Sequence, residues 1–386
     1  MTFALEVNTD QWRSHMHTVS AMVKSLTGSS IVPVIKGNGY GLGQARLARE
    51  SNALAGDCVA VGTVFELDEV LANSNADVVV LEPFEPRDLL AGDVWWDIAH
   101  TWPAHRVIRT ISSTSGLAAL SSGAGNVRVV LEARTSMNRF GFSEAEFTRA
   151  LAEPATRAAI ESGRVQICGL SLHLPLEQSV VADAGPGESA VTARVHEVQR
   201  WHSVWQTEAA KLGDVHQTLW LSHLSDAEYT QLQASNREMQ VKARVGTRLW
   251  LGERSALTVY GTALAVHPLP DGTHVGYRQR SGPNGGTLVV VSGGTSHGIG
   301  LSAPTPAASL RQRIVTAGTG ALDAAGRALS PFIWEGKQRW FAETPHQHHS
   351  MIWLPRGCVV PQVGDQLRAE VRFTTSRFDA VRGLES

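Results

Sequence analysis

Short apolar runs alternate with amphipathic stretches between residues 31 and 245. The runs, each five or six residues long, lie at 31–35, 58–62, 77–81, 107–111, 127–132, 167–172, 218–222 and 241–245. Such runs are typical of buried strands, and the stretches between them have helical spacing. Eight strands that alternate with helices require right-handed crossovers. The pattern therefore predicts an α/β fold, a closed parallel (β/α)8 barrel of the TIM type over residues 12–242.

Helix start signals support this alternation. Asn8, Thr9 and Asp10 supply N-cap candidates for a first helix. Apolar residues follow at helical spacing, namely Trp12, Met16, Val19, Val23 and Leu26. Ser143, with Glu146 three residues later, has the spacing of a capping box at the start of a later helix.

Beyond about Gly252 the chain becomes rich in β-type segments. These lie at 258–266, 287–292 and 350–354 and are separated by Pro, Gly and Asp turns. We expect a β-rich C-terminal domain over residues 243–386, joined by an N-terminal strand within residues 1–11. The region 302–330 is rich in Ala, Gly and Ser, and we expect a loop with a helical portion there.

Composition and charge narrow the range of partners. The formal net charge is -2, the pI is near 6.7, and Lys and Arg are scattered, so nucleic acid and anionic membranes are not expected partners. Cys58, Cys168 and Cys358 lie far apart without CxxC spacing, which indicates buried thiols in a reducing compartment. No apolar run approaches the roughly 20 residues of a membrane span, and the first residues do not resemble a signal peptide. We therefore expect a soluble, cytoplasmic protein.

The clearest chemical signal is the stretch IVPVIKGNGYGLG at residues 31–43. Lys36 ends an apolar run, and glycine occupies every second position from 37 to 43, which allows tight turns and close approach of the backbone. The glycine spacing matches neither a dinucleotide-binding GxGxxG motif nor a P-loop. A lysine at the end of a barrel strand instead suits a covalent bond to a carbonyl cofactor.

Other polar residues stand at the ends of the predicted strands or just after them: Glu132, Arg139, His173, Ser222, Ser225 and Arg244. Each has an ordinary structural alternative, such as a rim salt bridge for the arginines, a helix cap for the serines and a hydrogen-bonded structural role for the histidine. Barrel enzymes, however, place their working residues at the C-terminal ends of the strands. The convergence of all six on that one end favours a catalytic site.

The stretch 31–43 resembles the pyridoxal-phosphate lysine motif of the alanine racemase family, in which a strand ends in Lys and is followed by small residues, Asn, Tyr and Gly. RTSMNRFGF at 134–142 is similar to that family's GMNRLGF-type segment. ARVGTRLWLG at 243–252 resembles its ARPG segment, and HVGYRQR at 274–280 resembles the strand that bears its catalytic tyrosine. The resemblance spans nearly the whole chain in the expected order.

The resemblance implies roles for individual residues. Lys36 binds pyridoxal phosphate covalently and later acts as a base on one face of the α-carbon. The cofactor phosphate is held by the Tyr40 hydroxyl, by Ser222 or Ser225, and by backbone N–H groups near Gly246 and Thr247. Arg244 points at the pyridine nitrogen and makes the ring a weaker electron sink than a carboxylate partner does. Arg139 faces the phenolic oxygen of the cofactor and the substrate carboxylate.

The chain departs from the family pattern in three places. LSHLSD at 221–226 replaces the usual Asn-Ser pair and looks more like the segment of single-domain pyridoxal-phosphate homeostasis proteins. Glu132 stands where many members carry a carbamylated lysine; it supplies a similar negative charge, or it is a buried strand-end glutamate bonded elsewhere. WFAETPHQHHSMIW at 340–353 replaces the Cys-Met-Asp-type segment that lines the substrate carboxylate, and the family's late phosphate-contacting tyrosine is missing.

Racemisation needs a second base on the opposite face, and the resemblance assigns it to Tyr277, acting in the partner subunit's active site near His173. This implies a homodimer with shared active sites. The alternative for Tyr277 is an ordinary strand tyrosine. His346, His348 and His349 have a spacing that permits metal binding, but no further ligands complete the set, so we predict no metal.

The leading hypothesis is a pyridoxal-phosphate-dependent amino-acid racemase, with L- and D-alanine as the default substrate pair by resemblance only. A decarboxylase of the same fold is the first alternative, although the glycine run and the tail Cys-Asp pair of those enzymes are not evident. The second alternative is a non-catalytic pyridoxal-phosphate-binding protein, against which the β-rich domain and Tyr277 argue.

Overall fold

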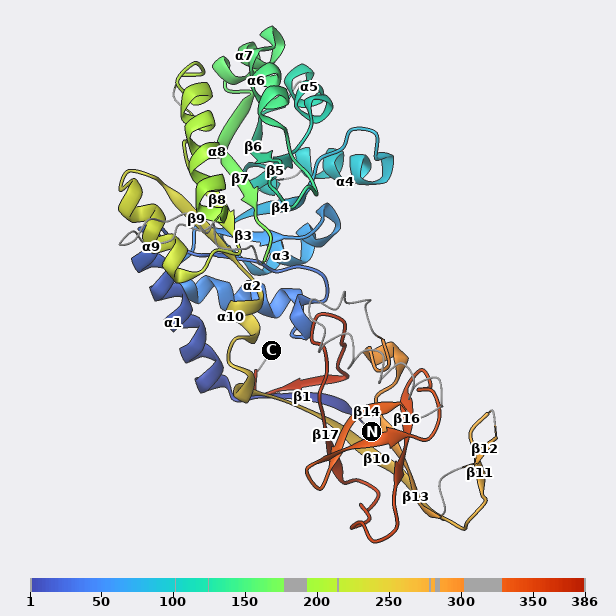
Figure 1. Ribbon diagram of the computed structural model, residues 1–386. Coiled ribbons are helices and arrows are strands. Elements are labelled where there is room, and N and C mark those ends of the chain that lie inside the picture. The colour runs from blue at the N-terminus through green and yellow to red at the C-terminus, as the bar shows by residue number, and fades with distance from the viewer. Residues whose placement is uncertain are drawn as a thin grey trace. The chain divides into compact units, whose positions relative to one another are not determined.

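The computed structural model describes residues 2–100, 102–123, 125–176, 193–213, 215–277, 279–281, 285–301 and 328–384 (Figure 1). The chain divides into two compact units. We call residues 14–39 and 43–252 the barrel unit, and residues 1–13, 40–42 and 253–386 the tail unit. The region predicted as loop with a helical portion lies mostly outside the described residues.

The barrel unit is built on eight parallel strands, as the sequence predicts. In chain order they are β2 (Val32–Pro33), β3 (Cys58–Val61), β4 (Asp77–Pro83), β5 (Val107–Ile111), β6 (Val127–Ala133), β7 (Val165–His173), β8 (Leu219–Ser222) and β9 (Val241–Val245). Successive strands from β3 to β9 pair side by side, and β9 pairs with β2. A parallel bridge between Val34 and Ala60 links the two ends of this order and closes the ring. The TIM-like fold class is thereby confirmed.

Helix α1 precedes the first barrel strand, and the other helices alternate with the strands along the chain (Figure 1). They are α1 (Thr9–Thr27), α2 (Gln44–Ser51), α3 (Leu67–Asn73), α4 (Leu89–Ala99), α5 (Thr114–Ser122), α6 (Glu144–Ala152), α7 (Pro154–Glu161), α8 (Ala193–Ala209), α9 (Asp226–Ser235) and α10 (Thr247–Leu251). The predicted capping box at the start of α6 is confirmed, since the Ser143 side chain accepts from the Glu146 N–H and the Glu146 carboxylate accepts from the Ser143 N–H. The barrel unit extends to Gly252 instead of ending at 242, because β9 and α10 belong to it.

Small and β-branched side chains, together with one tryptophan, form a buried cluster in the barrel. The cluster comprises Val32, Val34, Cys58, Ala60, Val79, Ile108, Val130, Cys168 and Trp220. Two tryptophans fix their orientation by hydrogen bonds to the backbone: Trp220 Nε1 donates to the Cys168 carbonyl at 2.9 Å, and Trp250 Nε1 donates to the Val34 carbonyl at 2.8 Å. Cys58 and Cys168 are buried free thiols, as expected, and burial raises the pKa of both. The interior is therefore a packed core.

The tail unit is a mostly antiparallel barrel. Its eight-stranded sheet contains β1 (Phe3–Val7), β10 (Leu257–Leu269), β13 (Gly286–Ser292), β14 (Leu329–Trp334), β15 (Lys337–Phe341), β16 (His349–Leu354), β17 (Gln366–Ala369) and β18 (Ala380–Arg382). Pairing of β13 with both β16 and β10 closes a ring. The N-terminal strand β1 joins this sheet beside β10. A separate hairpin is formed by β11 (His274–Val275) and β12 (Arg280–Ser281).

No helix in the described parts of the chain is both long and apolar enough to cross a membrane.

Candidate active site

The barrel residues that the sequence analysis singles out lie at one end of the strands. His173 at the end of β7 lies opposite Ser222 of β8, and Ser222 lies opposite Arg244 of β9. Arg244 also lies opposite Val32 of β2, four residues before Lys36. Because these strands are parallel, all these residues gather at the carboxyl end of the barrel, where barrel enzymes hold their working groups.

Lys36 follows β2, and one carboxylate holds its loop. The Gly37 N–H donates to Glu66 Oε1 at 3.0 Å, and the Gly62 N–H donates to Glu66 Oε2 at 2.7 Å. Lys36 is exposed as a residue, yet desolvation around its amine lowers its pKa; Arg139 lowers it further, and Glu66 raises it. A lowered pKa increases the fraction of neutral amine, which is the form that attacks a carbonyl carbon.

The glycine-rich turn after Lys36 has a strained geometry. A Cβ added at Gly39 (φ +59°) would lie 2.7 Å from the backbone nitrogen of Gln44, so only glycine fits there. Tyr40 is buried and adopts φ 55°, a left-handed conformation that is rare for an aromatic residue. Held strain of this kind is concentrated at functional sites. The contact of the Tyr40 hydroxyl with a phosphate stays a prediction.

Arg244 and Glu132 are buried charged groups with unused hydrogen-bonding capacity. Arg244 Nη2 donates to the Leu172 carbonyl at 3.0 Å, whereas its Nε has no acceptor among the described residues. Glu132 Oε2 likewise has no donor within the described part of the chain. Burial lowers the pKa of Arg244, and burial raises the pKa of Glu132 even though Arg244 and Arg139 favour its charged form. Such unused groups at a barrel end are suited to a ligand.

The loop after β6 folds back onto its own strand and carries Arg139. The Phe142 N–H donates to the Glu132 carbonyl at 2.9 Å. This close approach requires Gly141 (φ +110°), because a Cβ there would lie 2.4 Å from the Ala133 carbonyl carbon. The glycine of the MNRFGF segment thus has a structural reason, and it anchors the loop that presents the exposed Arg139.

His173 and the adjacent His223 lie at this end of the barrel, where burial and the charge of Arg244 act on both rings. Ser222 Oγ and His173 Nδ1 are 3.0 Å apart, and the His173 and His223 rings meet edge to face with centroids at 4.9 Å. Burial, then Arg244 and Arg139, lowers the pKa of His173 to about 2. Burial and the charge of Arg244 lower the pKa of His223 to about 4. Both rings are neutral at neutral pH, so they can accept or donate hydrogen bonds without adding charge.

Of the two serines considered for the phosphate, Ser225 caps a helix. Its hydroxyl accepts from the Glu228 N–H at 3.3 Å and its backbone N–H donates to Glu228 Oε2 at 2.8 Å, which completes the capping box of α9. Arg194 forms an ion pair with the same carboxylate at 2.7 Å. This supports the helix-cap alternative for Ser225. Gly246 and Thr247 stand at the start of α10, which has no side-chain cap.

The charge of this barrel end fits pyridoxal phosphate. The charges of Arg139 and Arg244 both lower the pKa of His173, so two guanidinium groups act on this end of the barrel. A phosphate ester and a phenolic oxygen are anionic groups that such a cluster attracts. Arg244 Nε, which has no acceptor among the described residues, can donate to a ring nitrogen, the contact that the family resemblance implies for this residue.

In the tail unit, Tyr277 lies in the turn between β11 and β12, so its expected position within a strand is wrong. The physical reason is Gly276, whose φ of +74° turns the chain after two strand residues. The ring of Tyr277 lies 4.8 Å from that of His346, centroid to centroid. No group of three or more metal-ligating side chains in the described ranges is arranged to hold a metal ion.

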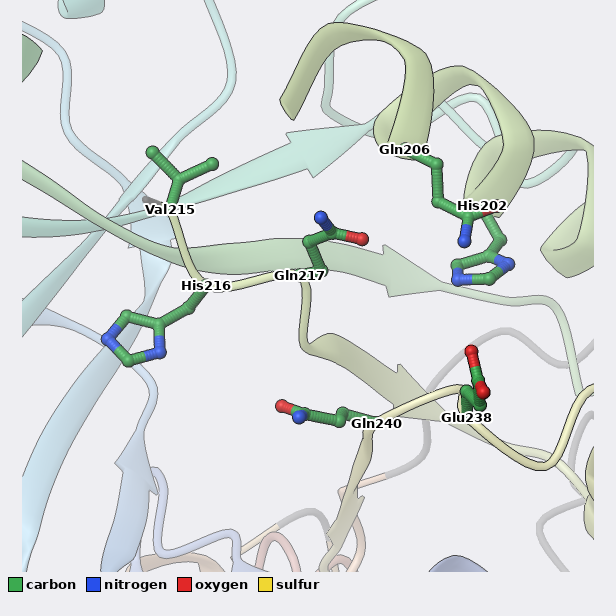
Figure 2. Close-up of a pocket in the computed structure, with 7 residues that line it drawn as sticks. All are labelled: His202, Gln206, Val215, His216, Gln217, Glu238 and Gln240. Atoms are coloured by element: carbon green, nitrogen blue, oxygen red, sulfur yellow. The ribbon is translucent and has the colours of Figure 1, made fainter. Parts of the chain in front are cut away.

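A separate pocket of about 320 Å³ lies elsewhere on the barrel unit (Figure 2). His202 of α8 lines it together with Gln217 and Gln240, which precede β8 and β9. Figure 2 shows these polar side chains arranged around the starts of the two strands. The pocket is therefore at the amino end of the strands, opposite the end that carries Lys36 and Arg244.

Comparison with known proteins agrees with this geometry. The sequence profile of one family, described as "Alanine racemase, N-terminal domain", matches residues 7–211, more than half of the 386 residues. The chain belongs to this family. A comparison with curated proteins gives no match.

Solved structures of alanine racemases share the fold at low sequence identity. The alanine racemase of Bartonella henselae, described with covalently bound pyridoxal phosphate, has 14% identity and a TM-score of 0.62 over 96% of this chain and 91% of its own. The alanine racemase of D-cycloserine-producing Streptomyces lavendulae has 17% identity and a TM-score of 0.60 over 96% and 87%. The histidine racemase of Leuconostoc mesenteroides has 18% identity and a TM-score of 0.57 over 95% and 87%. This alanine racemase-family chain is thus a divergent member.

The sequence analysis missed three residues that lie next to the residues it singled out, two in the barrel unit and one in the tail unit. Glu66 lies on the helical segment after β3 and has no motif around it. His223 follows Ser222 directly, and its positive φ of 67° gave no local signal. Glu343 is a single acidic residue in an otherwise uncharged stretch, which could have marked it as a partner for the neighbouring histidines.

Proposed function

We propose that this chain is a pyridoxal-phosphate-dependent amino-acid racemase that acts as a homodimer. The observation that carries the proposal is that Lys36 follows β2, while the adjacent strand β9 carries the buried Arg244, which lies opposite Val32 and helps to lower the pKa of the Lys36 amine. An arginine beside a cofactor ring disfavours protonation of the ring nitrogen, which suits reversible proton exchange better than reactions that need a strong electron sink.

Pyridoxal phosphate, when bound, supplies the electron sink that stabilises negative charge at the α-carbon of an amino acid. Lys36 holds the cofactor through its amine. Arg139 binds the substrate carboxylate, and Arg244 donates to the cofactor ring. Tyr40, Ser222 and the backbone N–H groups of Gly246 and Thr247 hold the phosphate; Ser225 stabilises the neighbouring helix.

Inversion at carbon needs a proton to leave from one face and to return on the other, so two groups are required. Lys36, with its lowered pKa, takes or returns the proton on one face. Tyr277 of the partner subunit serves the other face, with His173 near it. Glu132 supplies the negative charge that balances Arg139, in place of a modified lysine.

Alanine is the default substrate because of the family. A histidine racemase shares the fold at a similar identity, so the side chain of the substrate has to be found by assay. Purified protein saturated with pyridoxal phosphate is incubated with single L-amino acids, and the products are separated by chiral chromatography while released carbon dioxide is measured. Lys36→Ala is the matched control.

The proposal expects a D-enantiomer to accumulate from at least one amino acid, without gas release, and only with Lys36 present. Carbon dioxide released at every turnover would assign the chain to the decarboxylases. Firm cofactor binding with no turnover of any amino acid would assign it to the non-catalytic binding proteins.

A further inference from the structure

The side chain of Tyr277 has only one neighbour among the ring contacts described, namely His346. The two ring centroids are 4.8 Å apart and the planes are inclined by 31°, so the phenol lies over the face of the imidazole. The rest of the side chain is open, since Tyr277 is 86% exposed. One face of the phenol is therefore supported within its own unit, and the remainder is presented outward.

His346 is itself fixed at both edges of its ring. Its Nε2 lies 2.7 Å from Glu343 Oε1, and its Nδ1 lies 2.9 Å from His349 Nε2. An ionised carboxylate only accepts, so the Nε2–H of His346 donates to Glu343. Two in-plane hydrogen bonds leave only the faces of the imidazole free. The face that meets Tyr277 thus has a defined orientation.

Glu343 connects this arrangement to the turn as well. Its side chain is almost completely buried. A Cβ added at Gly276, which has φ +74°, would lie 1.9 Å from Glu343 Oε2. The carboxylate therefore occupies the space beside the residue that immediately precedes Tyr277. Glu343 touches the turn that carries the tyrosine and, through His346, supports its ring.

We propose that Glu343 and His346 form a positioning pair that holds the Tyr277 phenol in one orientation for proton transfer. The inference rests on the proposed function, because it takes Tyr277 as the second proton-transfer group. An exposed tyrosine on a short hairpin otherwise samples several side-chain rotamers, and proton transfer needs the hydroxyl at hydrogen-bond distance and in line. Both His346 nitrogens bond within the tail unit, so the imidazole supports the phenol and does not itself transfer the substrate proton.

The test compares His346→Leu, which removes the supporting ring and both hydrogen bonds, with His348→Leu. His348 lies in the same segment, and its side chain contacts Ser296 and His297, so it is a matched control. His346→Gln is the second variant, which can still bond to Glu343 but lacks the ring. Correct folding of each variant is checked by its circular dichroism and its cofactor content.

Exchange of the α-proton in deuterated water is measured separately for the L- and D-enantiomers of the best substrate. Tyr277→Phe identifies the enantiomer whose proton goes to the tyrosine. His346→Leu and His346→Gln are expected to slow that exchange by about 10-fold or more, part of the roughly 10²-fold that a misplacement of 1 Å can cost. Exchange from the other enantiomer, handled by Lys36, stays within about 2-fold of the parent in all variants, because a proton transfer on that face needs only Lys36.

A second readout does not depend on activity. Fluorotyrosine is incorporated, and the fluorine NMR signal of Tyr277 is assigned from its loss in Tyr277→Phe. We expect a single fluorine signal from a ring with restricted reorientation in the parent and in His348→Leu, and faster reorientation of the ring in His346→Leu.

If the His346 variants slow α-proton exchange equally from both enantiomers, or slow neither and leave the fluorine signal unchanged, the positioning pair is overturned. The racemase proposal stays intact in either case. Racemisation by Tyr277→Phe at the parent rate would instead overturn the two-base function and, with it, the catalytic role of the pair. The fluorine signal then still decides whether the pair orients the phenol.

Discussion

Glu66 offers the sharpest test of how the cofactor lysine is positioned. Its two carboxylate oxygens accept from the Gly37 N–H at 3.0 Å and the Gly62 N–H at 2.7 Å. A hydrogen bond to a charged acceptor contributes about 1.5–3 kcal/mol net. Glu66→Gln keeps one acceptor oxygen but turns an amide NH2 toward the other backbone donor. We therefore expect the local opening free energy of this loop to fall by about 1–2 kcal/mol, allowing for partial exposure.

Amide hydrogen exchange measures this change directly. A loss of about 1–2 kcal/mol corresponds to roughly 5- to 30-fold faster exchange in the peptides that contain Gly37 and Gly62. Glu69→Gln is the matched control, because Glu69 also accepts from a backbone N–H, that of Ala45 at 3.2 Å, in the first turn of α2. Glu69→Gln should speed amide hydrogen exchange near Ala45 and leave exchange in the peptides that contain Gly37 and Gly62 unchanged.

The same substitution should change the chemistry of Lys36. Glu66 raises the pKa of the amine, so its removal lowers that pKa further. The pH at which half of the protein is fixed to pyridoxal phosphate by borohydride should therefore move downward in Glu66→Gln, with the label mapped to Lys36. Unchanged exchange together with an unchanged pH midpoint, as in the control, would refute the assigned role of Glu66.

Two further predictions concern assembly and pH. Mixing inactive Lys36→Ala and Tyr277→Phe proteins should form hybrid dimers with one intact active site and restore part of the racemase activity; demonstrated subunit exchange without recovered activity would contradict shared sites. The pKa of His173 is lowered from 6.5 to about 2 by folding. Below pH 6.5 the unfolded chain therefore binds a proton that the folded chain does not, and the folded state loses stability as the pH falls from 6.5 toward 2. The free energy of unfolding, measured in urea, should fall less between pH 7 and pH 5 in His173→Asn than in the parent, by about 1 kcal/mol when partial exposure is allowed for. An identical fall in both proteins would show that the histidine is not held neutral.

The repeating part of the fold could be predicted from the sequence because each strand is a local apolar run. The strands at 107–111 and 241–245 have the expected bounds. The run at 31–35 shortens to Val32–Pro33, since Pro33 has no N–H to continue the ladder, although a bridge at Val34 preserves the pairing. Strands could be predicted where short apolar runs recur along the chain and become buried.

The barrel part of the candidate site followed from the same regularity. Once the strands were assigned, parallel topology required His173, Ser222 and Arg244 to lie side by side at one end. The partners of these residues could not be predicted, because they depend on loops whose paths are set by single positions. Glu66, for example, reaches Gly37 across 29 residues of sequence.

The tail unit contains contacts that no local sequence pattern predicts. The turn at Gly276 and the contact of Tyr277 with His346 join segments about 70 residues apart, and no local pattern connects them. The histidines were visible as a cluster, but the sequence did not indicate that Glu343 fixes one of them. A buried acidic residue beside histidines is recognised only when its neighbours in space are known.

The stereochemistry of α-proton exchange in Tyr277→Phe tests the central claim most directly. The variant, loaded with pyridoxal phosphate, is incubated in deuterated water with each enantiomer of the amino acid that the parent racemises best. With Lys36 and Tyr277 as opposed proton-transfer groups, racemisation should fall by about 10²-fold or more. One enantiomer should still exchange its α-proton with retained configuration, because Lys36 removes and returns the proton on the same face. Racemisation at the parent rate, or equal loss of exchange from both enantiomers with the cofactor still bound, would contradict the two-base account.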